Sequence, residues 1–510
     1  MHAEDAGLEG TNGCLNRSCP SSRISTGPSM SPSSAAHAAL ISLLLAAASG
    51  CRTNGIPLSA YRAETPATPV AASASEDAPA IPSSDVQLTA AEELVKDSAV
   101  PNLEAVEVLD LATLEQYALE NNPALKQANA SVAKAVGFRD QVGLYPNPTA
   151  GYNGTQLADR GTDQHVGFIE QEIVTGHKLQ RNRLVLAQEV QAQLWQAEAT
   201  RLRIVTDVRT RFYETLAAQE RVRLAREFES VAAEGVQAAR KRIDALEGSR
   251  PELLQTQIQQ SEIQLLKQRA EIAYLASWKS LFAVIGTPCE FNRGLAGSLE
   301  VPLEEQDWEA TYGQLAEVSP EVRMACSRVA RAQANLERQQ VQPIPNLAVM
   351  VAGGYDKGTG SELINTQVGV PIPLFNRNQG NIAAAWGEYC RATQELQRVK
   401  LALRTRLLEA GRTYDSAAAQ VRRYDEDILP MAKEALTLAE QSFRAGEMEF
   451  LQVLIVRRTF FDSNLQTVQA RMEFAQASAL VDGLLLSGSL SESTDTAADD
   501  GLRGQTLGGQ

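Results

Sequence analysis

The chain has 510 residues, more than the ~250 to 300 over which a single hydrophobic core grows, so several domains or a repeated architecture are expected. Hydrophobic residues make up 44% and charged residues 21%, as in ordinary globular proteins, which excludes a wholly disordered or collagen-like chain. The formal net charge of -15 would repel a phosphate backbone, so nucleic acid is not an expected partner. The six cysteines form no CxxC pair and indicate neither a zinc site nor a disulfide framework.

Residues 1–50 have the pattern of a signal peptide. The apolar run 38–48 (AALISLLLAAA) is about half as long as the ~20 residues that a membrane-spanning helix needs. It leads into Ala-Ser-Gly-Cys51, which resembles the lipobox at which bacterial lipoproteins are cleaved and acylated on the new N-terminal cysteine. Cys51 is therefore the expected lipid anchor. An ordinary secretory signal is the alternative, and translation from Met30 would remove both arginines that precede the run.

An internal duplication follows a tether rich in Ala, Pro and Ser. The motif NPAL at 122–125 is matched by SPEV at 319–322, and the same spacing carries the Pro-x-Pro segment 146–148 onto 343–345. We therefore expect two repeats joined by a short linker. The expected divisions are a tether at 51–106, repeats at 107–290 and 307–488, a linker at 291–306 and a disordered tail at 489–510.

Both repeats predict the same order of elements. A short helix is followed by a second helix that opens at Pro123 or Pro320, and then by a Pro-x-Pro segment that no helix crosses. Two extended runs joined by a small polar turn come next, and a long helical hairpin ends the repeat. The expected short helices are 113–121 and 308–318, and the expected strands are 149–156, 164–174, 347–355 and 363–374.

The second strand pair alternates clearly between apolar and polar residues, whereas the first pair alternates poorly. The apolar positions of the second pair are Leu347, Val349, Val351 and Tyr355 on one strand and Ile364, Val368, Val370, Ile372 and Leu374 on the other. The strand lengths are close to the ~9 to 11 residues of a membrane β-strand. Strands that lie in a membrane are therefore expected.

The longest helix is expected between Gly176 and Gly248, a stretch that contains no proline and one interior glycine. About 70 helical residues would extend over ~105 Å. Apolar residues near its far end step by three and four, as in a coiled-coil seam. The seam residues are Val222, Ala225, Phe228, Ala232, Val236, Ala239, Ile243 and Leu246.

The chain turns at Gly248 and returns as a second helix over 251–285. The second repeat is expected to turn likewise at Gly446. Its outbound helix is expected to be interrupted at Gly387, Gly411 and Pro430, with a kink near the proline. Each repeat thus ends in an antiparallel helical hairpin.

Four amphipathic strands are too few to close a barrel, and lipid tolerates no open sheet edge because unpaired N–H and C=O groups find no water there. Two copies would give eight strands, a barrel filled by its own side chains, whereas three give twelve strands and leave a lumen. The predicted fold class is therefore mainly α with membrane β-strands. As a homotrimer it would form a 12-stranded β-barrel continued by an α-helical tunnel.

Three segments resemble the TolC family of outer-membrane efflux proteins: 114–123 (LEQYALENNP), 143–148 (GLYPNP) and 442–447 (SFRAGE). The last segment and the lipobox are most similar to the cation-efflux branch that includes CzcC and CusC. The resemblance implies a passive trimeric duct in the outer membrane that carries small solutes, heavy-metal cations or drugs, out of the periplasm. It also implies two partners, a periplasmic adaptor (membrane fusion) protein and an inner-membrane pump of the resistance-nodulation-division type.

Family members often carry an acidic residue six positions after the tip glycine, near the inner mouth. Here Leu254 and Gln452 occupy these positions, so the sequence gives no support for a carboxylate ring at that level. Charges nearer the two turns are our candidates for gating or adaptor contact, with ordinary solvated helix ends as the alternative for each. With the tip glycines, these candidates are Asp244, Glu247, Gly248, Arg250, Arg444, Gly446, Glu447 and Glu449.

No enzymatic motif accompanies this pattern. The four histidines form no HExxH or other i, i+4 pair, and neither a nucleophile elbow nor a P-loop occurs. We predict no catalytic residue, metal ligand or cofactor. The alternative function, from a different class, is a lipid-anchored periplasmic coiled-coil adaptor or scaffold, which would lack membrane strands.

Overall fold

The computed structural model describes residues 109–158, 161–246, 248–287 and 294–491. All of them belong to one compact unit, Val100–Gln510. The expected signal peptide, Cys51 and the tether lie outside the described residues, as does most of the expected tail.

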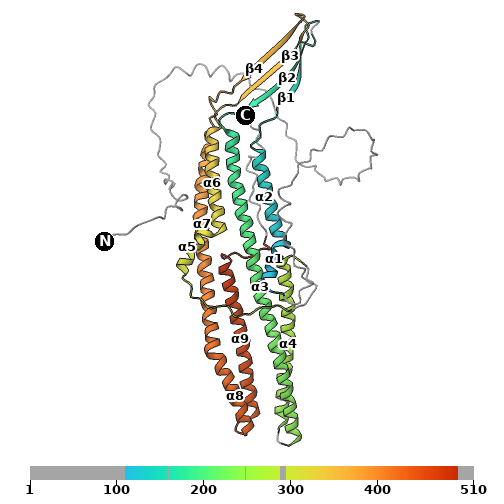
Figure 1. Cartoon of the computed structure of the whole chain (residues 1–510), viewed down its shortest axis with the longest axis vertical. Helices are drawn as coiled ribbons and strands as arrows, with labels where there is room; N and C mark the ends of the chain where they lie inside the picture. The colour runs from blue at the N-terminus through green and yellow to red at the C-terminus, as the bar shows by residue number, and fades with distance from the viewer. Residues whose placement is uncertain (1–108, 159–160, 247, 288–293, 492–510) are drawn as a thin grey trace, which may run out of the picture. The chain divides into compact units, whose positions relative to one another are not determined.

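The elements predicted from the sequence occur in the predicted order in both halves of this unit (Figure 1). The first half contains α1 (Leu111–Asn121), α2 (Pro123–Gln141), β1 (Thr149–Thr155), β2 (Gln164–Ile173), α3 (Lys178–Asp244) and α4 (Arg250–Ile285). The second half contains α5 (Trp308–Val318), α6 (Pro320–Val341), β3 (Leu347–Asp356), β4 (Ser361–Gly369), α7 (Gln379–Arg423), the π-helical turn η3 (Tyr424–Ile428), α8 (Leu429–Ala445) and α9 (Phe450–Asp482).

Capping side chains define where the short helices begin and end. Asn122, which is fully buried, accepts a hydrogen bond from the N–H of Ala124 at 2.8 Å and so caps α2. Its amide also donates to the carbonyl of Val284 at 2.6 Å, which fixes the start of α2 against the end of α4. Asp110 caps α1 and Asp307 caps α5 in the same way. One local signal therefore sets both a helix boundary and a tertiary contact.

The four strands form one antiparallel sheet in the order β1-β2-β3-β4. The central pair β2–β3 joins the two repeats, in a register that runs from Gln164 opposite Asp356 to Ile173 opposite Leu347. This pairing requires Gly354, because a Cβ there would lie 1.9 Å from the carbonyl oxygen of His165. The two halves of the unit are thus paired along a single sheet.

The register divides the sheet into an apolar and a polar face, because alternate residues point to opposite sides. The apolar face carries Ala150, Tyr152, Ile169, Ile173, Leu347, Val349, Val351, Tyr355, Ile364 and Val368, with four polar residues among them, His165, Gln171, Glu362 and Thr366. The opposite face is more polar and carries Thr149, Asn153, Thr155, Gln164, Glu170, Glu172, Asp356, Ser361, Asn365 and Gln367, together with the apolar Val166, Phe168, Met350, Ala352 and Leu363. The apolar positions of the second pair, down to Val368, therefore share one face as their alternation predicted.

The fourth strand is shorter than predicted. β4 ends at Gly369, so Val370, Ile372 and Leu374 do not continue its apolar face. Pro371 and Pro373 interrupt this stretch, and proline has no N–H to donate to a strand ladder. The alternation there was a misleading signal.

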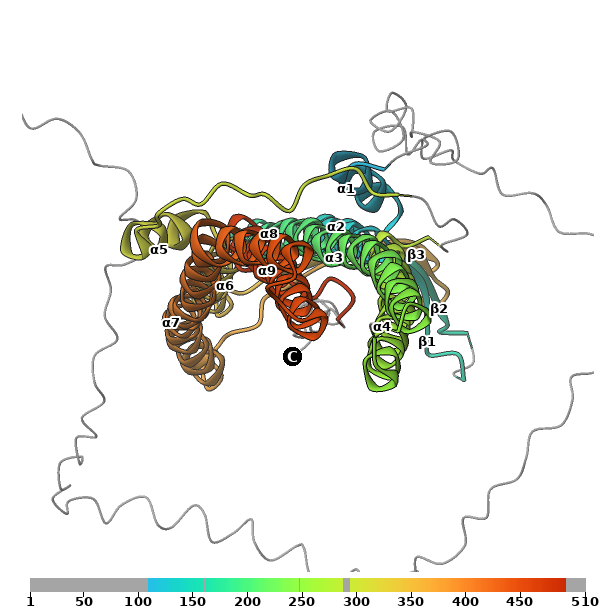
Figure 2. The same ribbon diagram turned by 90° about the horizontal axis from the view of Figure 1, so that it is seen from below.

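The long helices form a curved layer when viewed along their length (Figure 2). α3 contacts α4, α6 and α9, while α7 contacts α6 and α9. α1 and α5 lie on the convex side of the layer. Among the described helices, none combines the length and the apolar composition that a membrane crossing requires.

The core lies where α1, α4 and α9 pack against α3. Its fully buried side chains include Trp278, Leu281, Ile285, Leu114 and Ile204. A second cluster, formed by α7 and α9, also takes in side chains of the chain between the repeats. Both clusters lie away from the sheet, where only Val166 and Ala352 are buried.

The structure confirms a single long α3, of 67 residues. It differs from the prediction at Leu246, Gly387 and Gly411. Leu246 does not belong to the seam: it follows the end of α3, has φ 65° and is 95% exposed. Gly387 and Gly411 do not interrupt α7. At Gly411 a Cβ would lie 3.0 Å from the Trp308 ring, so this glycine permits close packing. The break occurs at η3 and Pro430, close to the predicted kink.

Candidate functional site at the two hairpin ends

The turn of the first hairpin, between α3 and α4, is held by hydrogen bonds. Gly248 donates its N–H to the carbonyl of Arg242 at 3.0 Å, and a Cβ there would lie 3.0 Å from the Arg242 Cβ. Ser249 and Glu252 form a capping box at the start of α4, with N–H to side-chain distances of 3.4 and 3.1 Å. The Glu252 carboxylate also lies 3.8 Å from Arg242 Nη1. These contacts connect the described residues Gly248 and Ser249 to the end of α3 and the start of α4.

The turn of the second hairpin, between α8 and α9, ends α8 with a left-handed glycine. Gly446 has φ 76° and donates its N–H to Phe443 O at 3.1 Å, while Glu447 donates to Ser442 O at 2.9 Å. This pattern of hydrogen bonds is a common helix ending that favours glycine. The tip glycine predicted from the sequence is required here by backbone conformation.

Near their turns, the two hairpins contact each other through aromatic side chains between α9 and α3. Phe450, which is 6% exposed, lies 5.5 Å from Phe443 between ring centroids and also packs over α3, where a Cβ on Gly235 would lie 3.9 Å from its ring. Farther along, the ring centroids of Phe228 and Phe461 are 3.8 Å apart. These aromatic contacts hold α9 against α3.

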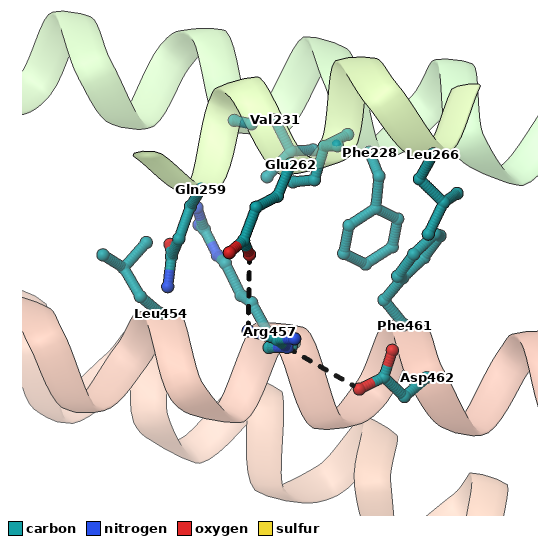
Figure 3. A pocket seen from close by; sticks show the side chains of 12 residues that line it. Phe228, Val231, Gln259, Glu262, Leu266, Leu454, Arg457, Phe461 and Asp462 are labelled. Atoms are coloured by element: carbon teal, nitrogen blue, oxygen red, sulfur yellow. Dashed lines mark ion pairs between the residues drawn. The ribbon is translucent and has the colours of Figure 1, made fainter. Parts of the chain in front are cut away.

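A pocket of about 110 Å³ lies between α3, α4 and α9, next to this aromatic pair (Figure 3). Its lining is mostly apolar, with Phe228 and Phe461 at one end. Arg458 lies at its rim, 3.5 Å from Glu262 of α4 and 3.9 Å from Asp462 of its own helix. These ion pairs are more than half exposed, so each adds little stability but places charge at the groove between the hairpins.

The predicted tip charges lie at the end of the unit opposite the sheet (Figure 1). In the described part of the chain, these charges are all exposed and form no ion pair: Asp244, Arg250, Arg444, Glu447 and Glu449. Glu247 lies outside the described residues. The structure thus brings the candidates to two neighbouring turns, where they are open to solvent and to a partner.

Sequence reasoning missed the residues that connect the hairpins. The six-position rule pointed to Leu254 and Gln452, and both side chains are exposed. The carboxylates beside the groove belong instead to Glu262 and Asp462, farther from the turns. No local signal could have paired Arg458 with Glu262, because the two residues lie on different repeats. The described residues contain no cluster of three or more His, Cys, Asp or Glu side chains placed to hold a metal ion.

Sequence comparison links the second repeat to a known family. Residues 311–485 match the family described as outer membrane efflux protein. Over 386 residues the chain is 26% identical to the cobalt-zinc-cadmium resistance protein CzcC of Cupriavidus metallidurans. That alignment covers 75% of this chain and 91% of CzcC. The similarity thus extends over both repeats rather than one motif.

Solved structures share the fold. The outer membrane protein VceC of Vibrio cholerae superposes with a TM-score of 0.61 at 16% identity, over 74% of this chain and 96% of VceC. CusC superposes with a TM-score of 0.58 at 16% identity, over 75% of this chain and 94% of CusC. The family match and the similarity to CzcC favour an efflux protein over the adaptor or scaffold alternative. Residues 311–485 thus match the outer membrane efflux protein family, and the strand-and-hairpin fold of the whole unit is shared with VceC and CusC.

Proposed function

We propose that three copies of this protein form a passive conduit through which a periplasmic adaptor and an inner-membrane pump discharge small solutes across the outer membrane. The observation that carries this proposal is the amphipathic sheet. Its apolar face is open to solvent in the single chain: Ile364 is 81%, Val368 62%, Ile169 61% and Val351 52% exposed. An exposed apolar surface of this kind marks a site of contact with lipid or another protein.

The two outer strands supply the argument for assembly. β1 and β4 each pair on one side only among the described strands, so each leaves a row of unpaired N–H and C=O groups. Lipid cannot satisfy these groups, whereas a neighbouring copy can, by pairing its β1 with this β4. Three copies give twelve strands and a lumen lined by the polar face of the sheet.

The helices would extend this lumen into the periplasm. The 67 residues of α3 correspond to roughly 100 Å at 1.5 Å per residue. Three curved layers such as the one in Figure 2 would enclose a tunnel. In this arrangement the turns at Gly248 and Gly446 lie at the inner mouth. The charged candidates there would then meet the adaptor or gate the mouth.

The N-terminal assignments fit the same arrangement. We propose that residues 1–50 direct export, that Cys51 is acylated, and that 51–106 tether the anchor to the folded unit. The division into two repeats, a linker and a tail stays a proposal on the same footing. Acylation would be tested by labelling with a radioactive or clickable palmitate, and Cys51→Ala should abolish the label.

For the exported solute we propose divalent metal cations. The support is the match to CzcC, whose name records resistance to cobalt, zinc and cadmium. Because the conduit is passive, selectivity would reside in the pump rather than in this chain. Drugs and dyes are the other class to be tested.

Purified protein should run as a heat-labile trimer on a gel and produce discrete conductance steps in planar lipid bilayers. In cells, deletion of the coding sequence should sensitise the strain to metals, and the intact protein should restore resistance. A protein that a carbonate wash releases as monomers would refute the conduit. Sensitivity to dyes alone would leave the conduit intact and overturn the metal assignment.

A further inference from the structure

The outbound helix of the second repeat contains a break that the first repeat lacks. In η3 the N–H of Leu429 donates to Tyr424 O, five residues back instead of four, and Pro430 follows at the start of α8. The matching stretch of α3, residues 226–230, is regular α-helix. A π-turn inside a long helix is a common place for a kink and for functional adjustment.

Packing differs strongly on the two sides of this turn. On the α7 side, the Tyr414 ring lies 5.5 Å from Trp308 and 4.9 Å from Phe474 between centroids. Its hydroxyl also donates to Glu304 O at 3.0 Å. On the α8 side, Ala439 is the single buried residue among the described residues of that helix. Segments with few buried side chains open at lower free-energy cost, so η3 separates a well-buried helix from one that opens more readily.

One arginine connects the π-turn to the chain between the repeats. Arg471 of α9 lies with Nη2 at 3.0 Å from Asp425 Oδ1 in η3 and with Nη1 at 3.1 Å from Glu300 Oε1. The planar guanidinium can hold both carboxylates at once, which lysine cannot do with the same geometry. We call Arg471, Asp425 and Glu300 the clasp.

A cavity of about 850 Å³ adjoins the clasp, between the inter-repeat chain, η3 and α9. Leu429 and Pro430, the first residues of α8, lie in its wall together with Asp425 and Arg471. Close packing therefore does not fix the start of α8 on this side. On this side the ion pairs of the clasp hold the π-turn, whereas its Tyr424 packs against the α7–α9 cluster.

We propose that Arg471 is a positioning residue that holds η3, and through it α8 and the turn at Gly446, in one arrangement against the inter-repeat chain. This inference rests on the proposed conduit, whose inner mouth that turn would border. Loss of the clasp frees the π-turn and lets α8 move into the adjoining cavity. The clasp thereby regulates how readily the mouth opens.

Hydrogen exchange of the purified full-length trimer tests the clasp without reference to transport. Arg471→Met should accelerate exchange in 424–430 about fivefold, the factor that corresponds to a partly buried ion-pair network. Arg457→Met is the matched control: Arg457 is on the same helix, is 28% exposed against 27% for Arg471, and pairs with Glu440 at 2.8 Å. It should leave exchange in 424–430 unchanged.

Glu300→Gln provides a variant that cannot disturb the core, because the Glu300 side chain is 72% exposed. It should accelerate the same exchange by a smaller factor and add nothing in the Arg471→Met background, because the two changes remove one interaction. Additive effects, or equal exchange in Arg471→Met and wild type, would overturn the clasp.

Single-channel recording then links the clasp to the mouth. Arg471→Met should raise the open fraction about fivefold over wild type, with an unchanged yield of heat-labile trimers, and Glu300→Gln should raise it by a smaller factor. A conducting wild type with no change in Arg471→Met overturns the inference and leaves the conduit standing. If exchange in Arg471→Met is accelerated but the trimer never conducts, the clasp is supported and the proposed function is refuted.

Discussion

Replacing Ile364 with arginine tests whether the apolar face of the sheet meets lipid. Ile364 is 81% exposed on that face of β4, and the next residue, Asn365, is exposed on the polar face. If both faces met water, the two positions would be equivalent surface sites. Each substitution would then change the free energy of unfolding by about 0.5 kcal/mol or less. If the apolar face meets lipid instead, the two substitutions should have different effects on the free energy of unfolding.

The expected difference follows from the position of the residue along the strand. β4 has nine residues, and Ile364 is next to its central residue, so it would lie close to the middle of the bilayer. An arginine on the lipid face near that depth costs about 2 to 4 kcal/mol in each protomer. Asn365→Arg would place the same charge in the aqueous lumen, where, as at other solvent-exposed sites, the cost is about 0.5 kcal/mol or less.

The assay is urea unfolding of protein refolded into lipid vesicles, read together with the fraction of heat-labile trimer on an unheated gel. Ile364→Arg should lower the unfolding midpoint and the trimer fraction, while Asn365→Arg stays near wild type. Equal effects would show that the apolar face does not contact lipid. A larger effect at Asn365 would mean that the sheet faces the other way.

Three further changes test the protomer itself. Gly354→Ala should block refolding of the sheet, since its Cβ would overlap a β2 carbonyl, while Gly353→Ala, with open space around it, should refold normally in the same assay. Burial lowers the pKa of Lys178, so the unfolded chain holds this proton more tightly. Stability in urea should therefore rise with pH toward the ordinary lysine pKa of 10.5, and less so in Lys178→Met. Asn122→Ala should cost about 2 to 4 kcal/mol in urea unfolding, because it removes a cap and leaves Val284 O unpaired.

The order of elements could be predicted because short-range signals mark their boundaries. The helix expected at 308–318 agrees with the structure at both ends: Asp307 caps its start, and the Ser319-Pro320 pair ends it and opens the next. The second strand pair followed from period-two alternation between turn residues, whereas the first pair, which alternates poorly, followed from its place after the matching Pro-x-Pro segment. Alternation misled where Pro371 and Pro373 end β4, since periodicity does not register a missing N–H.

The contacts that connect the hairpins could not be predicted in this way. Phe228 and Phe461 meet across the two repeats, and nothing near either residue in the chain identifies its partner. The π-turn was equally hidden, because a single extra residue per turn leaves the apolar spacing almost unchanged. Pro430 indicated a kink but not its form, since a proline is equally at home in the first turn of a new helix.

The two ends of the folded unit depend on assembly to different degrees. The helices bury large clusters of their own, whereas the four strands bury only Val166 and Ala352 and leave their apolar face open. A small sheet with so little core has little stability alone in water. Lipid and the strands of neighbouring copies would have to supply what is missing. Stability of the sheet then depends on protomer concentration, while stability of the hairpins does not. In the proposed trimer, the hairpins should therefore fold first, and closing of the barrel should be the step that commits three copies to the membrane.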